Sequence, residues 1–170
     1  MSTEYVLTKL NKTRQLVAGK LKSIDSMLDA REELLLKYCT LLDPRVEGTE
    51  QDLPQQKKIS DFCNLLIDYM SQGHFHIHPR IVQIMETVSG KRLSIAQRII
   101  PRLHNTTEAL LTFDDKYGEN ADNTDLRDFK QDLSKLGETL EIRFKLEDRL
   151  VVVLQMLDDI LAKPNKKQKD

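Results

Sequence analysis

Three histidines stand close together in the segment GHFHIHPR, at His74, His76 and His78. Imidazole binds metal ions and carries protons near neutral pH, so this spacing could indicate a metal site or a catalytic centre. On a β-strand the alternation would place all three rings on one side. The segment joins two predicted helices, however, so strand geometry is not expected. We interpret His74 as a hydrogen-bonded residue near a helix end rather than as a metal ligand.

A second pair of candidate ligands lies in the segment HNTTE, where His104 and Glu108 are four residues apart on one face of a predicted helix. Helical bundles hold di-iron centres with carboxylate and histidine ligands, but such centres need similar pairs on facing helices. We find no such set, and the motif ExxH does not occur. We therefore predict no metal and no cofactor. The alternative is a helical-bundle metalloprotein that uses His104, Glu108 and the histidines of residues 74–78.

Motifs of common enzyme classes are also absent from the sequence. It contains no Gly-rich phosphate loop, no GxSxG and no HExxH. The acid pairs Asp114–Asp115 and Asp158–Asp159 are neighbours on predicted helices, and neighbouring side chains on a helix point to different sides. We interpret these carboxylates as solvated charges rather than as catalytic pairs.

The elements that position these residues are predicted to be helices. A chain of 170 residues is most simply one domain with a real hydrophobic core. It has only six glycines and five prolines, which leaves few places for the many turns of an all-β fold. We therefore predict an all-α fold, an antiparallel bundle of long helices with short extra helices and a long C-terminal helix.

Helix start and stop signals divide the chain into six helical stretches, separated by Gly- and Pro-containing turns. The predicted stretches run from Ser2 or Thr3 to about Gly19, over about 20–43, from Pro54 to the residue before Gly73, from Ile77 or Pro79 to Val88, over 91–117, and from Asn123 or Thr124 to about Ala162. The segment DPRVEGTEQDLPQQ is expected to be an exposed connection. Pro101 is expected to break or kink the fifth stretch.

Charge is distributed unevenly along the chain. Residues 163–170, KPNKKQKD, form a basic tail with a net charge of +3, which we expect to be disordered. The chain as a whole carries −1, so residues 1–162, the single predicted domain, carry −4. A mildly acidic body does not suggest direct binding of nucleic acid.

The cellular compartment is expected to be the cytoplasm. No run of about 18 apolar residues is present, and the first residues, MSTEYVLTKLNKTRQ, lack the apolar core of a signal peptide. Cys39 and Cys63 are too far apart for a CxxC site and too few for a disulfide framework. Each stands among apolar neighbours, so we expect buried, reduced thiols.

The predicted last helix has an apolar seam that contains two charges. Alternating steps of three and four residues connect its apolar positions, and the same series includes Arg143 and Glu147. The apolar members are Leu126, Phe129, Leu133, Leu136, Leu140, Leu150, Leu154, Leu157 and Leu161. Because Arg143 and Glu147 are four residues apart, they can pair on one helix face.

Two interpretations of this pair stay open. A slight rotation of the helix would bring Phe144 and Val151 inward and leave the pair at the margin, since a helix face is wider than a strict seam. Alternatively, the bundle contains an internal polar network, because buried ions are costly unless paired. Its predicted members are Arg31, which interrupts the apolar stripe of the second helix, and Glu138, Arg143 and Glu147.

Two segments resemble a known family. The segment DFCNLLIDYMSQGHFHIHPRIV, residues 61–82, and the segment LGETLEIRFKLEDRLVVVL, residues 136–154, are similar to the signatures of the regulator of sigma D family, which also contains the alginate regulator AlgQ. Weaker similarity covers LDAREELLLKYCTLL, residues 28–42. Length and helix order also agree, so the resemblance spans nearly the whole chain. DYMSQGHF and RFKLEDRL are specific as a pair.

The resemblance implies an all-helical anti-sigma factor of a bacterial cytoplasm, without catalytic activity. Members of the family bind the housekeeping sigma factor of RNA polymerase, chiefly its region 4, and so reduce its use in transcription. A monomer that binds sigma one-to-one is implied, without direct contact to nucleic acid or membrane. The same scaffold with another regulatory protein partner is a further alternative.

The resemblance also suggests which residues contact sigma. Asp68 matches the family's binding aspartate, although from helix spacing alone it would be an ordinary solvated carboxylate. Asp61 and Asn64 precede it on the same predicted helix, and His74 and Phe75 belong to the adjoining GHF motif. We predict that Asp68 is exposed, on a face that continues toward Asp61 and the GHF turn.

Overall fold

The computed structural model describes residues 8, 10–11, 13, 15, 22–42, 56–73, 79, 91–119, 121 and 125–161, and only the backbone of residues 22–23, 91–93, 96 and 154–161. Nearly all of these residues belong to four helices: α2 (Lys22–Leu42), α3 (Gln56–Gln72), α5 (Lys91–Tyr117) and α6 (Phe129–Leu161). No strand occurs among the described residues. The predicted all-α class is confirmed.

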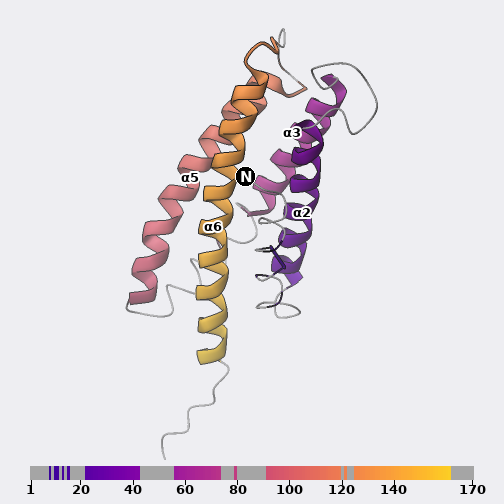
Figure 1. Cartoon of the computed structure of the whole chain (residues 1–170). Helices are drawn as coiled ribbons and strands as arrows, with labels where there is room; N and C mark the ends of the chain where they lie inside the picture. Colours follow the sequence, from indigo (N-terminus) through magenta and orange to yellow (C-terminus); the bar gives the residue numbers. More distant parts are fainter. Residues whose placement is uncertain are drawn as a thin grey trace, which may run out of the picture.

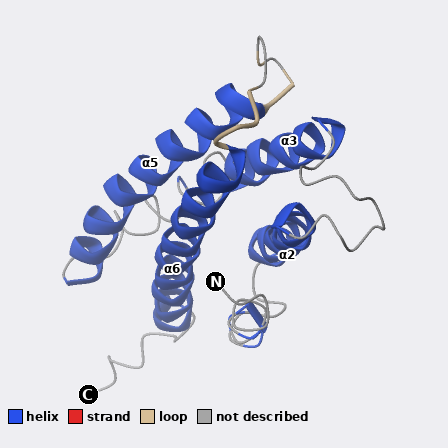
Figure 2. Cartoon of the chain, turned by 45° about the horizontal axis from the view of Figure 1, so that its top comes forward, coloured by secondary structure: helices blue, strands red, loops and turns tan. Residues whose placement is uncertain are grey.

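The four helices pack as a bundle (Figure 2), in which the backbone of each helix comes close to the backbones of two others. The contacts join α2 to α3, α3 to α5, α5 to α6, and α6 back to α2. Sequential helices are antiparallel within two of these pairs. Tyr38, late in α2, packs on Phe62, early in α3, with ring centroids 6.3 Å apart. Lys116, late in α5, pairs with Asp132, early in α6, and Figure 1 shows these two helices side by side.

The core is formed by one apolar stripe from each helix. On α3 the buried residues recur at steps of three and four, the spacing of an amphipathic helix, and they are Ile59, Phe62, Cys63, Leu66, Tyr69 and Met70. Near one end of the bundle the core contains aromatic rings from all four helices, namely Tyr38, Phe62, Phe113, Tyr117 and Phe129. Leu10, which precedes α2, is also buried in this core.

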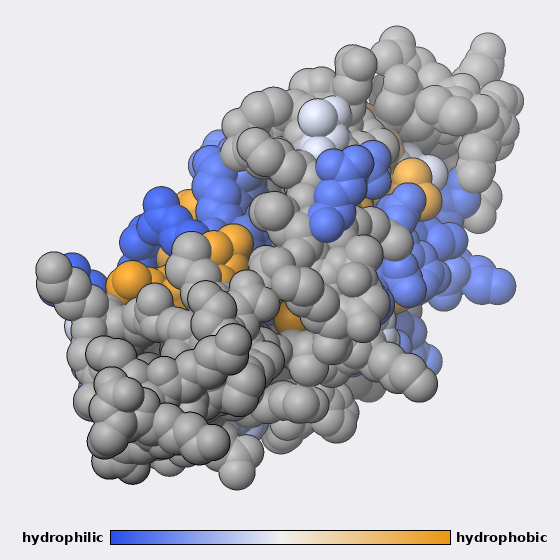
Figure 3. All heavy atoms as spheres, turned by 90° about the horizontal axis from the view of Figure 1, so that it is seen from below, coloured by the Kyte–Doolittle hydropathy of each residue, from blue (hydrophilic) through white to orange (hydrophobic). Residues whose placement is uncertain are grey.

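The outside of the bundle is mainly polar, with scattered apolar side chains. Figure 3, a view from below, shows hydrophobic side chains set among hydrophilic ones on that face. Large hydrophobic residues that are exposed include Leu36, Leu42, Ile95, Leu111 and Ile142. Within the described part of the chain, no helix has both the length and the apolar character needed to cross a lipid bilayer.

Three predicted helices agree with α2, α3 and α5 to within about two residues. The helix α5 continues through Pro101 without interruption, so a break at this position is not observed. Pro101 is exposed, and its ring therefore does not disturb the packed face. The described residues of the predicted first helix, Thr8, Leu10, Asn11, Thr13 and Gln15, are helical. Pro54 and most of the predicted fourth helix lie outside the described residues.

The start of the last helix differs from the prediction. We expected it at Asn123 or Thr124, but α6 begins at Phe129. A side-chain oxygen of Asp125 accepts a hydrogen bond from the backbone N–H of Arg127 at 3.0 Å, which forms a local turn that competes with the helix. The first helical bond then runs from the N–H of Asp132 to the carbonyl of Asp128, 2.9 Å away. Asp128 therefore occupies the N-cap position.

Candidate functional site

One face of α3 is open to solvent from Lys57 to Asp68. Lys57, Asp61, Asn64 and Asp68 are all exposed and follow one another at steps of four, three and four residues. This spacing places them on one stripe, opposite the buried face of the helix. Asp61, Asn64 and Asp68 therefore share a surface, and the predicted exposure of Asp68 is confirmed. We call Asp61, Asn64 and Asp68 the α3 face.

The α3 face is polar and has half-buried apolar residues beside it. Its two carboxylates and one amide can accept hydrogen bonds from cationic side chains. Leu65 and Ile67 are half-buried beside it and pack against the core. His74 and Phe75, the other two predicted contact residues, lie outside the described residues.

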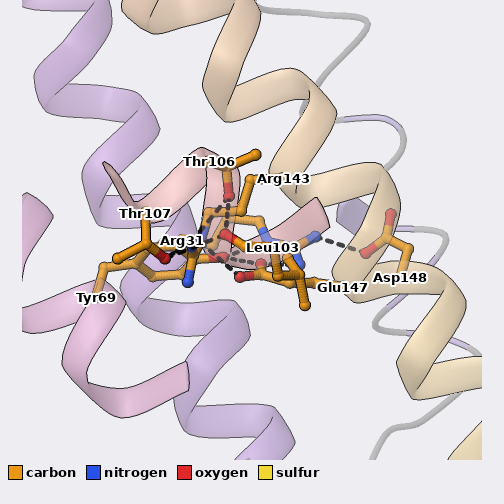
Figure 4. Close-up of polar contacts among 8 residues, drawn as sticks. All are labelled: Arg31, Tyr69, Leu103, Thr106, Thr107, Arg143, Glu147 and Asp148. Carbon is orange, nitrogen blue, oxygen red and sulfur yellow. Dashed lines mark hydrogen bonds and ion pairs between the residues drawn. The ribbon is translucent and has the colours of Figure 1, made fainter. Parts of the chain in front are cut away.

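A group of charged side chains is buried at the centre of the bundle (Figure 4). The carboxylate of Glu147 lies in the middle of this group and is only 3% exposed. Arg31 of α2 donates to it from Nη2 at 3.1 Å, and the hydroxyl of Tyr69 on α3 also donates to it. The Nε of Arg143 lies 2.8 Å from its other oxygen, Oε1. The partners of this one buried carboxylate thus come from three helices: Arg31 from α2, Tyr69 from α3 and Arg143 from α6, the helix that also carries Glu147.

The guanidinium of Arg143 also reaches α5. Its Nη1 donates to the hydroxyls of Thr106 and Thr107, at 3.1 and 2.9 Å. Both hydroxyls in turn donate to the backbone carbonyl of Leu103, as Figure 4 shows. Between Arg143 Nε and Glu147 Oε1, in contrast, the short distance reflects an ion pair without a directed hydrogen bond.

Arg31 makes the contacts that complete the group. Its Nη1 lies 2.7 Å from a carboxylate oxygen of Asp148, and its guanidinium stacks 4.7 Å from the ring centroid of Phe144. With Asp148 included, two guanidinium groups face two carboxylates, so the formal charges balance. Arg31, Tyr69, Thr106, Thr107, Arg143, Glu147 and Asp148 are called the buried cluster below.

The electrostatics of the buried cluster keep Tyr69 protonated and Arg31 charged. Burial is the largest influence on the Tyr69 hydroxyl and raises its pKa, Glu147 raises it further, and the two arginines oppose the shift. Tyr69 therefore stays protonated and can donate to Glu147. Burial works against the charge on Arg31, but Tyr69, Glu147 and Asp148 together raise its pKa above the ordinary value.

The structure brings three of the four predicted network residues together, Arg31, Arg143 and Glu147. The fourth assignment was wrong: Glu138 is exposed. Residue 138 falls between the buried positions Leu136 and Leu140, so its side chain points to solvent. Phe144 and Val151 are buried as the alternative interpretation required, yet the charged pair is buried with them, because the packed face of α6 is wide.

Four members of the buried cluster were missed by sequence reasoning, namely Tyr69, Thr106, Thr107 and Asp148. The sequence did carry a signal for Thr106 and Thr107, which are adjacent in the middle of a predicted helix. Threonine has a low helix propensity, so two of them at this place suggest another role for their side chains. Asp148 gave no signal of its own, because it directly follows Glu147 and resembles a solvated charge.

The candidate metal ligands are not gathered in the described part of the structure. His104 and Glu108 are both exposed on α5. Among the described residues, no three His, Cys, Asp or Glu side chains lie together as a metal site requires. His74, His76 and His78 lie outside those residues.

Both cysteines are free thiols. Cys63 is fully buried on α3, and Cys39 is half-buried on α2. Burial is the main cause that raises the pKa of the Cys63 thiol to about 12, and the nearby Asp114, to which it hydrogen-bonds, adds to the shift. Cys63 is therefore protonated near neutral pH and is a poor nucleophile.

Comparison with known proteins places the chain in a family. A family model described as "Regulator of RNA polymerase sigma(70) subunit, Rsd/AlgQ" matches residues 6–155. The chain belongs to the Rsd/AlgQ family. The match includes every residue of the buried cluster and of the α3 face.

Curated relatives agree with this assignment. A protein named Regulator of sigma D from Yersinia enterocolitica is 36% identical over 147 residues, which cover 86% of this chain and 88% of the relative. Its namesake from Yersinia pseudotuberculosis is 37% identical, with 86% of this chain and 87% of the relative covered. Another, from Pectobacterium carotovorum, is 33% identical and has 96% of its length covered. The resemblance expected from the sequence is confirmed.

Proposed function

We propose that this protein is an anti-sigma factor. It binds the housekeeping sigma factor of RNA polymerase, chiefly region 4, and thereby reduces the use of that factor in transcription. The observation that carries this proposal is the exposed α3 face, with Asp61, Asn64 and Asp68 on one stripe, in a chain of a family described as regulators of the sigma-70 subunit.

Charge complementarity supports the choice of region 4. That region is a basic helix-turn-helix module that grips promoter DNA, so its cationic side chains fit the two carboxylates of the α3 face. A partner that covers these cations competes with DNA for them. His74 and Phe75 come after α3 and Gly73 in the sequence, and we include them in the contact surface.

The buried cluster has a positioning role in this proposal. Tyr69 is the residue next to Asp68, and its hydroxyl is held by Glu147 and by Arg31. Because the packed side of α3 is fixed in this way, Asp68 is presented to solvent in one orientation before the partner arrives. A preorganised surface loses less conformational entropy on binding than a mobile one.

Sequestration needs no catalytic step. In this proposal the protein is not an enzyme, acts in the cytoplasm, uses no cofactor, does not contact nucleic acid directly and binds sigma one-to-one as a monomer. Regulation then follows from the amounts of the two proteins and their affinity.

The test is a titration of isolated, fluorescently labelled sigma region 4 with wild type, Asp68→Ala and Asp68→Lys. We expect Asp68→Ala to weaken binding by about fivefold and Asp68→Lys by about tenfold or more, since lysine adds repulsion to the lost attraction. Wild-type affinity should also fall as salt rises, because exposed charges are screened over about 8–10 Å. Thermal melts should stay unchanged.

A matched control is Glu33→Lys, the same change of charge at an exposed position of α2. Equal affinity of wild type and Asp68→Lys at low salt would remove the α3 face from the interface. A similar loss in Glu33→Lys would mean that only overall charge matters.

A further inference from the structure

The α3 face is too small to bind a protein by itself. Asp61 and Asp68 are seven residues apart, which is about 10 Å along a helix. Stable protein interfaces bury about 800 Å² on each partner. An interface that includes the α3 face must therefore continue onto a neighbouring element. Within the described structure, the helices whose backbones come close to α3 are α2 and α5.

A second exposed stripe lies on α5. Its members recur at alternating steps of four and three residues and are all exposed, namely Gln97, Pro101, His104, Glu108, Leu111 and Asp115. This spacing places them on one side of the helix, away from the buried Leu103, Thr106 and Leu110. We call these six residues the α5 stripe. It contains two carboxylates and no lysine or arginine.

The register between α3 and α5 follows from contacts at two levels. Cys63 of α3 hydrogen-bonds to Asp114 of α5. Six residues later on α3, the ring of Tyr69 lies 6.0 Å from the guanidinium of Arg143, which bonds to Thr107, an earlier residue of α5. Positions thus ascend on α3 as they descend on α5, so the two helices are antiparallel.

An apolar step lies at the outer edge of the seam between these helices. Ile67 follows Cys63 by four residues and Leu111 precedes Asp114 by three, so both lie on the flanks by which the two helices face each other. Ile67 is half-buried, and Leu111 is 42% exposed. Solvent therefore reaches an apolar side chain beside the seam.

Carboxylates from both helices stand around this apolar step. In the antiparallel register, Asp61 is level with Asp115 and Asp68 is level with Glu108, each to within about one residue. The two levels are about 10 Å apart along the helices. The α3 face and the α5 stripe thus present four acidic side chains at two levels, with Leu111 between the levels.

These four carboxylates are not neutralised within the described part of the chain, where none of them forms an ion pair. Lys116, the residue after Asp115, pairs instead with Asp132 of α6. Lys57, one turn before Asp61, adds one positive charge to the same side of α3. Four carboxylates and one lysine leave a net charge of −3.

The other neighbour of α3 fits a basic partner less well. The exposed positions of α2 include Lys37, whereas the α5 stripe has only acidic charges besides His104. Charge complementarity with a basic partner therefore favours α5 over α2 as the continuation of the α3 face.

We propose that the sigma-binding surface extends from the α3 face across the seam to Glu108, Leu111 and Asp115 of the α5 stripe. This extension rests on the proposed anti-sigma function. The surface fits one basic amphipathic helix of region 4 that lies along the seam. Cations seven residues apart on such a helix are about 10 Å apart and match the two levels of carboxylates, while an apolar side chain between them covers Leu111.

The experiment titrates labelled region 4 with the full chain as wild type, Glu108→Lys, Asp115→Lys and Leu111→Ala. We expect each charge reversal to weaken binding about fivefold and Leu111→Ala to weaken it about threefold. Affinity should also depend less on salt in Asp115→Ala, because one exposed charge fewer is screened. Melting temperatures should stay close to that of wild type, since all three positions are exposed.

Matched controls come from the exposed side of α6. Glu138→Lys makes the same change of charge at an exposed position. Ile142→Ala shortens an apolar side chain that is 47% exposed, close to the exposure of Leu111. Both controls should bind region 4 as wild type does.

The outcomes separate this extension from the anti-sigma proposal. Weakened binding in Asp68→Lys, with wild-type affinity in Glu108→Lys, Asp115→Lys and Leu111→Ala, would overturn the extension and leave the anti-sigma proposal standing. Equal losses in Glu138→Lys and Asp115→Lys would overturn it as well, because only overall charge would then matter. If wild type does not bind region 4, both proposals fail.

Discussion

Cys63 illustrates how burial changes the chemistry of one side chain. Its thiol has no exposed surface, and its hydrogen-bond partner is the carboxylate of Asp114. Burial and the nearby negative charge both disfavour the thiolate. For Asp114, burial is the largest cause that raises the pKa, Asp115 adds to it, and the hydrogen bond from Cys63 opposes it. The Cys63 thiol is therefore the donor and the Asp114 carboxylate the acceptor of one hydrogen bond, and each group shifts the pKa of the other.

The raised pKa of Cys63 predicts a dependence of stability on alkaline pH. The thiol titrates near 9 in the unfolded chain and near 12 in the folded protein. Its contribution is fully present below pH 9 and is lost as pH rises toward 12, because the unfolded state releases the proton first. The free energy of unfolding should fall by up to about 1.4 kcal/mol per pH unit in this window.

Urea unfolding of wild type and Cys63→Ala at several pH values between about 8 and 10.5 measures this effect. Cys63→Ala should be less stable overall, but its free energy of unfolding should depend less steeply on pH. The tyrosines titrate in both proteins and contribute equally to their pH dependence. If the free energy of unfolding changed with pH equally in wild type and Cys63→Ala, the effect could not be assigned to Cys63.

At the scale of elements, the contact between α2 and α6 depends on a glycine. Gly137 is the only glycine of α6, and the phenol ring of Tyr38 from α2 lies directly against it. The hydroxyl of Tyr38 donates to the carbonyl of Leu133, 3.1 Å away. A Cβ atom at position 137 would collide with this hydroxyl and lie only 2.8 Å from Tyr38 Cζ.

We predict that Gly137→Ala destabilises the protein by about 1–3 kcal/mol, the usual cost of overpacking. This outcome is the reverse of helix propensity, which favours Ala over Gly by about 1 kcal/mol. The measurement is chemical unfolding of Gly137→Ala beside Ser134→Ala, an exposed position of the same helix. A gain of stability in Gly137→Ala would mean that Tyr38 moves aside without cost.

At the scale of the whole molecule, the buried cluster connects all four described helices. Arg31 comes from α2, Tyr69 from α3, Thr106 and Thr107 from α5, and the remaining members from α6. A buried ion pair of this kind adds little net stability over an apolar core, because desolvation offsets the attraction. Removing one partner is different, since it leaves an uncompensated charge inside the bundle.

Arg143→Ala should therefore destabilise the fold by about 3–5 kcal/mol. The total stability of such a domain is about 5–15 kcal/mol, so the loss should be evident in a melt. The matched control is Arg149→Ala, an exposed arginine of α6, which should cost less than about 0.5 kcal/mol. A loss below about 1 kcal/mol in Arg143→Ala would show that Arg31 and Tyr69 alone satisfy Glu147.

Local properties of the sequence determined the helices of this protein. The spacing of apolar residues and the scarcity of glycine and proline defined α2, α3 and α5, because helix formation depends on neighbours within a turn or two along the chain. They also placed Arg143 and Glu147 in the seam of α6 and Asp68 on the outer side of α3. The start of α6 was missed, because the side chain of Asp125 accepts a hydrogen bond from the backbone N–H of Arg127 and so forms a turn in place of the helix.

Only the tertiary structure decided what the charged residues contact. Sequence spacing left Arg143 and Glu147 either buried or marginal, and it chose Glu138 where the fold uses Asp148. Those partners come from segments more than 30 residues apart, such as Thr106 and Arg143. Which faces meet is settled by packing the apolar stripes of all four helices at once, and spacing within a single helix holds no information about the rotation of its neighbours.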